Sequence, residues 1–322
     1  MRIGWLSFHL VGKKALENLL NNGRSIDVVI TLNDKETSKR SGSFDYSVLC
    51  SKYNVPIYKI DHINTEQSIT LLKQLNLDIL FVIGWSQIID REILVIPRLG
   101  MVGVHSSLLP KYRGSAPVNW SIINGEQETG STLMLLDEGV DSGAIIDQIS
   151  IPITLYDSCK TIYDKVADAN VKMICKLYDN LYSKNFSYQP QKTNMLGNIL
   201  PRRRPKDGLI DWKNNSINLY NFIRAQSRPY PGAYSFIDNS KYYILQSAFF
   251  PKLTDNSSST YGQIIGHVYS TVNDACGVMV KCDDSVLLIL EIEDEKGNIF
   301  KGEKLNIFFT KGSIFSSKRG IS

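Results

Sequence analysis

The first half of the chain alternates short apolar runs with longer amphipathic segments. Runs of strand length occupy residues 2–6, 26–31, 56–60, 79–83 and 101–105. Between them, apolar residues recur every three or four positions in residues 13–20, 46–53, 66–75 and 91–96, which is the spacing of helices that bury one face. Strands separated by helices need crossover connections, so the pattern predicts an α/β domain with a largely parallel, Rossmann-like sheet.

The same alternation continues beyond this point. Pro117 is placed to begin a helix over residues 117–123, because proline is tolerated in the first helical turn. Strands are predicted over residues 132–136 and 145–151, and a long helix from residue 157 or 158 to residue 182. The polar segment 33–43, which carries Gly and Ser, is predicted to be a mobile loop.

The pattern changes after residue 184. Residues 185–198 are polar and irregular, and the run Pro201-Arg202-Arg203-Arg204-Pro205 is typical of a linker. Turn residues then separate six apolar runs, at 234–237, 242–246, 262–269, 277–282, 285–291 and 304–309, and one helix is predicted at 216–226. Many short strands predict a small β-barrel of the OB-like kind. We therefore predict an N-terminal domain over residues 1–200 and a smaller barrel domain over residues 207–315.

Composition excludes several classes of protein. The longest apolar runs have strand length, whereas a membrane-spanning helix needs about 18 apolar residues, so no membrane insertion is predicted. The five cysteines show no paired spacing and no signal peptide is evident, which predicts a cytoplasmic protein with reduced thiols. The sequence contains no CxxC or HExxH motif, so no metal site is predicted. It also lacks GxGxxG and GxxxxGK[ST] loops, which argues against a dinucleotide or nucleoside triphosphate site.

A histidine and an aspartate stand where predicted strands end. His105 closes the run 101–105, and Asp141 follows the run 132–136 inside a glycine-flanked loop. A carboxylate beside an imidazole orients the ring and stabilises its charged form, so the ring can take up a proton near neutral pH. The pattern favours a His/Asp pair for proton transfer. A capped strand-end histidine and an ordinary turn aspartate are the alternatives that the residues alone leave open.

The motif around this pair resembles the 10-formyltetrahydrofolate-dependent formyltransferases. The resemblance rests on the run His105-Ser106-Ser107-Leu108-Leu109-Pro110-Lys111-Tyr112-Arg113-Gly114 with Asp141-Ser142-Gly143 downstream. The second half adds Arg204-Pro205-Lys206-Asp207-Gly208-Leu209-Ile210-Asp211-Trp212, and the resemblance covers nearly the whole chain. It implies an enzyme that transfers a formyl group from 10-formyltetrahydrofolate to an amine and uses no metal. The domain over residues 1–200 would then be the catalytic one.

The resemblance also implies roles for individual residues. His105 would accept the proton of the attacking amine, and Asp141 would hold the ring and stabilise its charge. The residues expected to line the folate pocket are Gly84, Trp85, Ser86, Ser107, Leu108, Leu109, Pro110, Asp137, Glu138, Gly139 and Val140.

One residue departs from the family pattern. The family places an asparagine two residues before the histidine, where it is thought to donate a hydrogen bond to the oxyanion of the reaction. This chain has Gly103 there. Loss of one such donor typically costs about 2.7–4 kcal/mol of transition-state stabilisation. The departure supports one alternative function, a folate- or nucleotide-binding homologue with impaired catalysis.

The expected acceptor is the amine of a nucleotide-linked amino sugar for surface polysaccharide biosynthesis. Residues 116–126 are similar to the formyltransferase half of the bifunctional polymyxin-resistance enzyme, and residues 41–46 resemble other sugar members. Residues 207–322 contain 12 Lys and Arg against 12 Asp and Glu, so no nucleic-acid partner is predicted. His9, Arg113 and Trp120 are the candidate substrate contacts. A methionyl-tRNA formyltransferase is the main alternative, and the sequence leaves a homodimer open.

Overall fold

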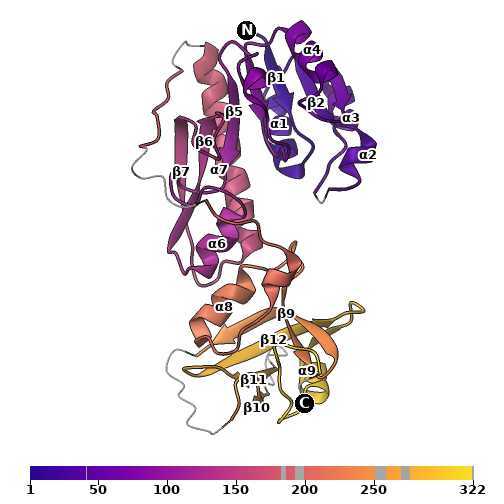
Figure 1. The fold of residues 1–322 in the computed structure, drawn as a ribbon, viewed down its shortest axis with the longest axis vertical. Helices are drawn as coiled ribbons and strands as arrows, with labels where there is room; N and C mark the ends of the chain where they lie inside the picture. The colour runs from indigo at the N-terminus through magenta and orange to yellow at the C-terminus, as the bar shows by residue number, and fades with distance from the viewer. Residues whose placement is uncertain (41, 183–185, 193–198, 251–258, 270–275, 321–322) are drawn as a thin grey trace. The chain divides into compact units, whose positions relative to one another are not determined.

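The computed structural model describes residues 1–40, 42–182, 186–192, 199–250, 259–269 and 276–320 (Figure 1). Ser41, which belongs to the segment 41–46 that resembles sugar formyltransferases, and half of the irregular stretch 185–198 lie outside the described residues. The chain divides into two compact units. The first unit comprises Met1–Pro117, Thr129–Pro152 and Asp164–Leu200, and the second comprises Val118–Glu128, Ile153–Tyr163 and Pro201–Ser322. The domain boundaries at residues 200 and 207 stay a prediction, since each unit combines separate stretches of chain.

A seven-stranded sheet forms the centre of the first unit. Its order is β3-β2-β1-β4-β5-β6-β7. The strands are β1 (Ile3–Leu6), β2 (Val28–Leu32), β3 (Ile57–Ile60), β4 (Ile79–Val82), β5 (Met101–His105), β6 (Glu128–Leu135) and β7 (Ile145–Pro152). Strands β1 to β5 pair in parallel, and β5 pairs antiparallel with β6. This arrangement confirms the predicted largely parallel α/β sheet.

Seven helices lie between residues 10 and 182 of the described chain: α1 (Leu10–Asn21), α2 (Asp34–Thr37), α3 (Tyr46–Tyr53), α4 (Glu66–Leu75), α5 (Arg91–Leu94), α6 (Pro117–Ile123) and α7 (Cys159–Tyr182). Nearly all of α6 and the start of α7 belong to the second unit. Side chains visible in the sequence set several of their starts. Asp45 caps α3 by accepting from the Ser47 N–H, and Thr65 caps α4 by accepting from the Ser68 N–H. The prediction of an unstructured loop over 33–43 is wrong in part, because Asn33 caps the one-turn helix α2 there.

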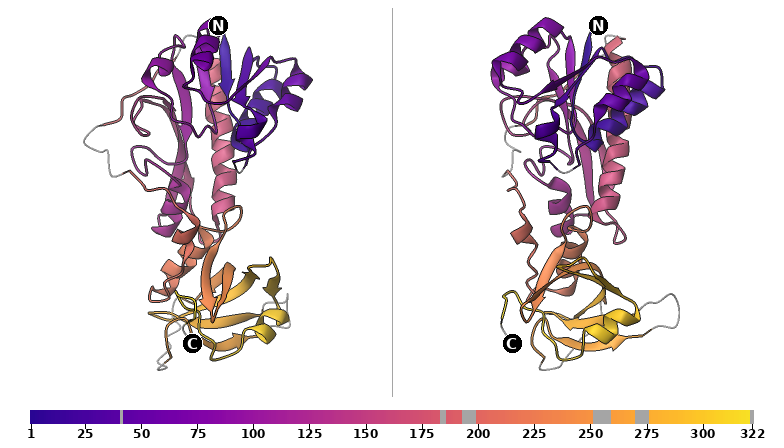
Figure 2. Two further views of the ribbon diagram at one scale, coloured as in Figure 1. Left: turned by 45° about the vertical axis from the view of Figure 1, so that its right-hand side comes forward. Right: turned by 90° about the vertical axis from the view of Figure 1, so that its right-hand side faces the viewer.

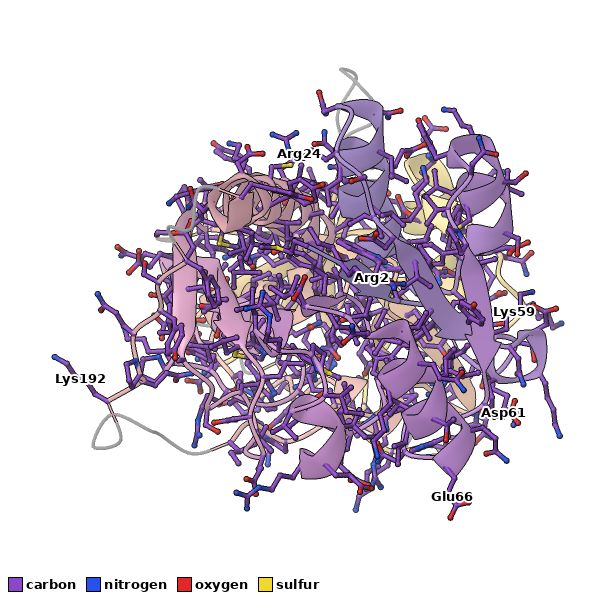
Figure 3. All side chains as sticks on the ribbon, turned by 90° about the horizontal axis from the view of Figure 1, so that it is seen from above. Arg2, Arg24, Lys59, Asp61, Glu66 and Lys192 are labelled. Carbon is purple, nitrogen blue, oxygen red and sulfur yellow. The ribbon has the colours of Figure 1, made fainter. Side chains whose placement is uncertain are left out.

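Strand alternation divides the core of this unit into two layers. Trp5 and Phe81 stack with ring centroids 5.7 Å apart and point toward α1, α3 and α7. Leu6 and Leu80 point to the opposite face, toward α4 and α5. Burial of each such side chain contributes about 1.5–3 kcal/mol. Figure 2 shows α7 lying along one face of the sheet, and Figure 3 shows the labelled charged side chains Arg24, Lys59, Glu66 and Lys192 around the outside.

The second unit is built on an antiparallel sheet. Its strands are β8 (Ala233–Ile237), β9 (Ser240–Phe249), β10 (Ile264–Val268), β11 (Gly277–Lys281), β12 (Val286–Asp294) and β13 (Ile299–Lys301), in the order β10-β11-β12-β9-β8 with β13 on β12. The C-terminal stretch bridges both edges, since Ile314 pairs with Gln263 and Ser316 pairs with Phe236. These bridges link the two edge strands, as a barrel requires. Helix α8 (Ser216–Arg224) packs on β9.

One predicted strand of this unit is wrong. Residues 304–309 were predicted to be extended, but Glu303–Phe308 forms helix α9, and the short strand β13 precedes it. Leu305 and Phe309 are buried, whereas Ile307 between them is 76% exposed. A strand would put all three side chains on one face, so the burial follows the helical period instead. In the described part of the chain, no helix is long and apolar enough to cross a membrane.

The helical register of α9 predicts unequal effects of two matched truncations. Leu305→Ala should lower the free energy of unfolding by about 2–5 kcal/mol, because Leu305 is fully buried. Ile307→Ala should change it by less than about 0.5 kcal/mol, because Ile307 is exposed. Denaturant midpoints of both variants measure this difference. Equal losses of unfolding free energy in the two variants would indicate that residues 304–309 are extended.

Candidate active site

His105 is the last residue of β5, at the carboxyl end of the parallel strands. The side chain is 9% exposed. Its Nε2 lies 2.8 Å from the carbonyl oxygen of Tyr112, and its Nδ1 lies 3.4 Å from Oδ1 of Asp141. Both ring nitrogens therefore face acceptor oxygens. A neutral ring donates from one nitrogen only, whereas a protonated ring donates to both.

Asp141 adopts a left-handed backbone conformation, with φ of 50°. Its second carboxylate oxygen accepts a hydrogen bond from the Gly114 N–H at 2.8 Å. Gly143 follows in the same loop, and a Cβ there would overlap the carbonyl oxygen of Leu135, so only glycine fits. The structure thus brings together the two residues that the sequence predicted as a pair.

The turn after His105 is tied to the neighbouring strands. Ser107 donates to the carbonyl of Lys111 at 2.7 Å, and the N–H of Leu109 donates to the hydroxyl of Thr132 on β6. Gln148 on β7 donates to the Leu109 carbonyl at 2.8 Å. Leu108 lies against Gly130. Of the expected folate contacts in this run, Ser107 and Leu109 are buried, and Leu108 and Pro110 are partly exposed.

The loop that contains Asp141 has its own internal support. Asp137 accepts from the Gly139 N–H and from the Ser142 hydroxyl, at 3.1 and 2.9 Å. Glu138 forms an ion pair with Arg91, and Val140 is 49% exposed. The expected folate contacts 137–140 therefore form a constrained turn whose outer side chains face solvent.

The third expected group, Gly84, Trp85 and Ser86, follows β4. Gly84 has φ of 68° and lies against His9. Trp85 packs edge-on against Phe8, with ring centroids 5.8 Å apart. Its indole Nε1 is buried and has no hydrogen-bond partner among the described residues. Ser86 accepts a hydrogen bond from Arg40.

The three candidate substrate residues have different surroundings. His9 caps α1 by accepting from the Val11 N–H, and burial lowers the pKa of its imidazole. Arg113 is 9% exposed and donates to the carbonyl of Val140, so it connects to the Asp141 loop. Trp120 belongs to the second unit, where its indole donates to the Pro201 carbonyl and the guanidinium of Arg203 covers its ring. Substrate contact by these residues stays a prediction.

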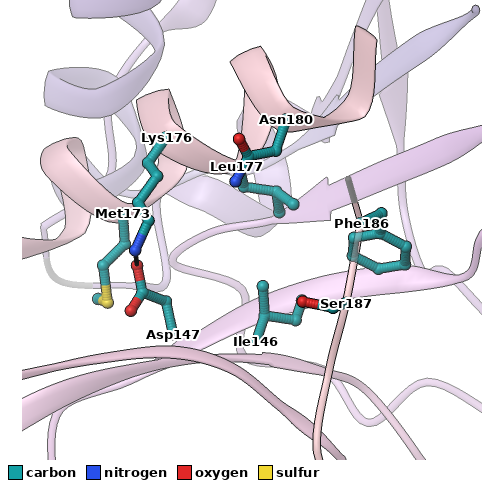
Figure 4. A pocket seen from close by; sticks show the side chains of 8 residues that line it. All are labelled: Ile146, Asp147, Met173, Lys176, Leu177, Asn180, Phe186 and Ser187. Atoms are coloured by element: carbon teal, nitrogen blue, oxygen red, sulfur yellow. Dashed lines mark hydrogen bonds and ion pairs between the residues drawn. The ribbon is translucent and has the colours of Figure 1, made fainter. Parts of the chain in front are cut away.

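A cavity of about 100 Å³ lies elsewhere in the first unit, between α7, β7 and the chain that follows α7 (Figure 4). Lys176 and Asp147 form an ion pair at its edge, with 2.8 Å between nitrogen and oxygen. The other lining residues are Ile146, Met173, Leu177, Asn180, Phe186 and Ser187. In the part of the chain that the structure describes, no group of three or more His, Cys, Asp or Glu side chains could hold a metal ion.

Comparison with known proteins identifies the family. A family described as "Formyl transferase" matches residues 9–177, and one described as "Formyl transferase, C-terminal domain" matches residues 203–307. This chain belongs to the formyl transferase family. The family and the formyl-transferring activity that the sequence motif predicted are thereby confirmed.

Two relatives of this transferase differ in how much of their length they share with it. The bifunctional polymyxin resistance protein ArnA of Wigglesworthia glossinidia brevipalpis is 33% identical over 97% of this chain, which spans 46% of that protein. This chain therefore has about half the length of that relative. The methionyl-tRNA formyltransferase of Caldanaerobacter subterraneus is 31% identical over 92% of this chain and 93% of its own.

Solved structures share the fold. A sugar 3N-formyl transferase, WlaRD, whose structure was solved in the presence of dTDP and 5-N-formyl-THF, is 20% identical. It covers 90% of this chain and 97% of its own, with a TM-score of 0.65. The N-formyltransferase from Helicobacter canadensis, with folinic acid and dTDP-3-aminofucose, is 20% identical and covers 90% and 98%, with a TM-score of 0.66. At this identity the two structures support the fold.

The position of the expected family asparagine is filled in another way. Gly103 lies on the same face of β5 as His105 and keeps regular pairing with Val82 and Met134. A Cβ on Gly103 would come within 2.7 Å of Cδ2 of Leu136. Leu136 packs on the apolar layer of β4 and α5. An apolar side chain therefore occupies the space where the amide would begin.

Sequence reasoning missed two residues of this site. Leu136 carried no signal because it ends an apolar strand, as many leucines do. Gln191, whose side-chain amide donates to the carbonyls of Asp141 and Gly143, comes from the irregular stretch after α7. No spacing rule connects that stretch to residues 50 positions earlier.

The collision with Leu136 predicts how an asparagine could be restored. Gly103→Asn alone should raise kcat little, because the new side chain must first displace Leu136. Gly103→Asn with Leu136→Ala should raise kcat by about 10- to 1000-fold over Leu136→Ala alone, with a smaller change in KM. Steady-state kinetics of the four proteins measure the gain. An unchanged kcat in the folded double variant would mean that another group already supplies the hydrogen bond.

Proposed function

We propose that this transferase moves a formyl group from 10-formyltetrahydrofolate to the amine of a nucleotide-linked amino sugar. The observation that carries the proposal is the His105–Asp141 pair at the end of β5, with 3.4 Å between Nδ1 and Oδ1. An amine that attacks a formyl carbon must lose a proton, and a buried imidazole supported by a carboxylate can accept it. The product would enter surface polysaccharide biosynthesis.

His105 must change one partner to act as a base. A ring that accepts a proton at Nε2 carries its own proton on Nδ1, which faces Asp141. The Tyr112 carbonyl, now 2.8 Å from Nε2, then has to give way to the substrate amine. Asp141 would stabilise the imidazolium that forms, and the Gly114 N–H keeps the other carboxylate oxygen in place.

The donor is supported by two solved relatives, one obtained in the presence of 5-N-formyl-THF and the other in complex with folinic acid. When bound, 10-formyltetrahydrofolate supplies the formyl carbon. The turn 137–140 and the residues 84–86 would hold it, while the partly buried turn 107–110 would shape the floor of the same site. Trp85 offers an aromatic face and a buried indole N–H that has no partner among the described residues.

The charge balance of the C-terminal part of the chain favours a nucleotide-linked amino sugar over tRNA as the acceptor. Residues 207–322 contain equal numbers of basic and acidic residues, 12 of each, whereas a tRNA-binding appendage normally carries a basic face. One solved relative was obtained in the presence of dTDP, and the other is in complex with dTDP-3-aminofucose. Methionyl-tRNA formyltransferase is the second candidate, and its support is sequence identity of 31% over nearly the full length of such an enzyme.

The proton-transfer role predicts the effect of one substitution. His105→Asn should reduce kcat by more than about tenfold, because a neutral amide cannot accept the amine proton. Folate affinity, measured by calorimetry on the same protein, should stay within a few-fold. A variant that keeps more than about a tenth of the rate would remove His105 from the mechanism.

The acceptor class predicts a binding contrast. At physiological salt the protein should bind a nucleotide-linked amino sugar measurably and should show no measurable affinity for tRNA. Titrations of both ligands over a range of salt concentrations measure this. Tight tRNA binding whose affinity falls steeply with salt would indicate several contacts to phosphates. It would favour a methionyl-tRNA formyltransferase.

A further inference from the structure

Three short stretches of the first unit meet around Asp141. Gln189 pairs with Ile145 through two backbone hydrogen bonds of 2.8 Å, just after the Asp141 loop. Leu200 pairs with Arg113 and Ser115, on either side of the glycine that donates to the Asp141 carboxylate. Described residues that follow α7 therefore contact both loops that hold the His105–Asp141 pair.

Gln191 makes the most direct of these contacts. Its side-chain nitrogen donates to the carbonyl of Asp141 at 2.9 Å and to the carbonyl of Gly143 at 2.8 Å. The side chain is buried, with 9% of the residue exposed. The amide thus forms hydrogen bonds to the main chain on both sides of Ser142. The opposite amide orientation would place its oxygen against two carbonyl oxygens, so these acceptors fix which way the amide points.

The main chain at Asp141 needs such support. A φ of 50° is sparsely populated for a residue with a side chain, and surrounding contacts must maintain it. The direction of the Asp141 side chain follows from this backbone conformation. If the loop relaxed toward negative φ, the carboxylate would turn away from Nδ1 of His105 and from the Gly114 N–H.

We propose that Gln191 is a positioning residue of this enzyme. It holds the left-handed backbone of Asp141 and thereby sets the distance between the Asp141 carboxylate and His105. The inference rests on the proposed roles of His105 and Asp141, and it concerns no feature of the acceptor.

Two substitutions of Gln191 separate the effect of its hydrogen bonds from the effect of its side-chain volume. Gln191→Leu keeps similar volume and removes both donors. Gln191→Glu is isosteric, and its ionised carboxylate would face two carbonyl oxygens, so protonation of this buried group should be favoured. The protonated side chain regains one donor. Gln189 is exposed on the same stretch, so Gln189→Leu and Gln189→Glu are matched controls.

The first readout does not depend on turnover. Nitrogen-15 NMR of labelled histidine reports the protonation and hydrogen bonding of the His105 ring, and His105→Asn identifies its signals among the four histidines. Gln191→Leu should shift the Nδ1 signal of His105, whereas Gln189→Leu should leave it unchanged. An unchanged His105 spectrum in folded Gln191→Leu would overturn the proposal, whatever the acceptor proves to be.

The second readout is kinetic, with whichever amine supports turnover. Gln191→Leu should lower kcat about tenfold or more with KM changed less than about threefold, because position rather than binding is lost. Gln191→Glu should show a new pH dependence in which activity relative to the wild type recovers as pH falls. Neither control should do so.

A double variant tests whether Gln191 acts through Asp141. In the background of Asp141→Asn, adding Gln191→Leu should reduce kcat by less than about threefold further, since the partner it positions has already lost its charge. If the kcat loss of the double variant equals the product of the two single losses, Gln191 acts independently of Asp141, and the proposal is overturned. Loss of the folded state in both Gln191 variants would also overturn it, because the residue would then be structural.

Discussion

The left-handed backbone at Asp141 is the constraint on which the site depends. That conformation turns one carboxylate oxygen toward Nδ1 of His105 and the other toward the Gly114 N–H. It can persist only while neighbouring groups hold the loop, because a residue with a side chain seldom adopts positive φ. The Gly143 position, where only glycine fits beside Leu135, and the amide of Gln191 supply that support. The proposed proton-transfer pair thus combines the end of one strand with a left-handed turn residue.

The sheet explains how residues so far apart in sequence meet. Strand β5 ends at His105 and pairs with β6, whose chain continues into the Asp141 loop. The Thr132 hydroxyl on β6 accepts from the Leu109 N–H and donates to the Ser107 carbonyl, so the turn after His105 is tied to the strand before Asp141. Apolar packing on both faces fixes the register of β5, since a slip of one residue would turn His105 to the other face. The packing of the core therefore also determines the geometry of the site in this unit.

The sequence predicted most of this frame because its signals are local. The helices predicted at residues 46–53 and 66–75 have these bounds in the structure, and the apolar run before His105 ends where strand β5 ends. Residues 304–309 misled the prediction, since Leu, Ile and Phe suit a strand, while the burial of Leu305 and Phe309 around exposed Ile307 is decided by tertiary packing. Gln191 could not be predicted either. Its partners are main-chain carbonyls 50 and 48 residues away. Every residue has a main-chain carbonyl, so the sequence does not show which ones accept.

Gly103 and Leu136 put an apolar side chain where the family motif leads one to expect a polar one. The family motif leads one to expect an amide donor at residue 103, and the partly exposed side chain of Leu136 lies where that amide would begin. Among the serines next to His105, Ser107 already donates to the Lys111 carbonyl, whereas the Ser106 hydroxyl has no hydrogen-bond partner among the described residues. A hydroxyl or backbone N–H aimed at the reacting carbonyl would stabilise the charge that develops there in place of that amide, because a preorganised donor needs no reorganisation during the reaction.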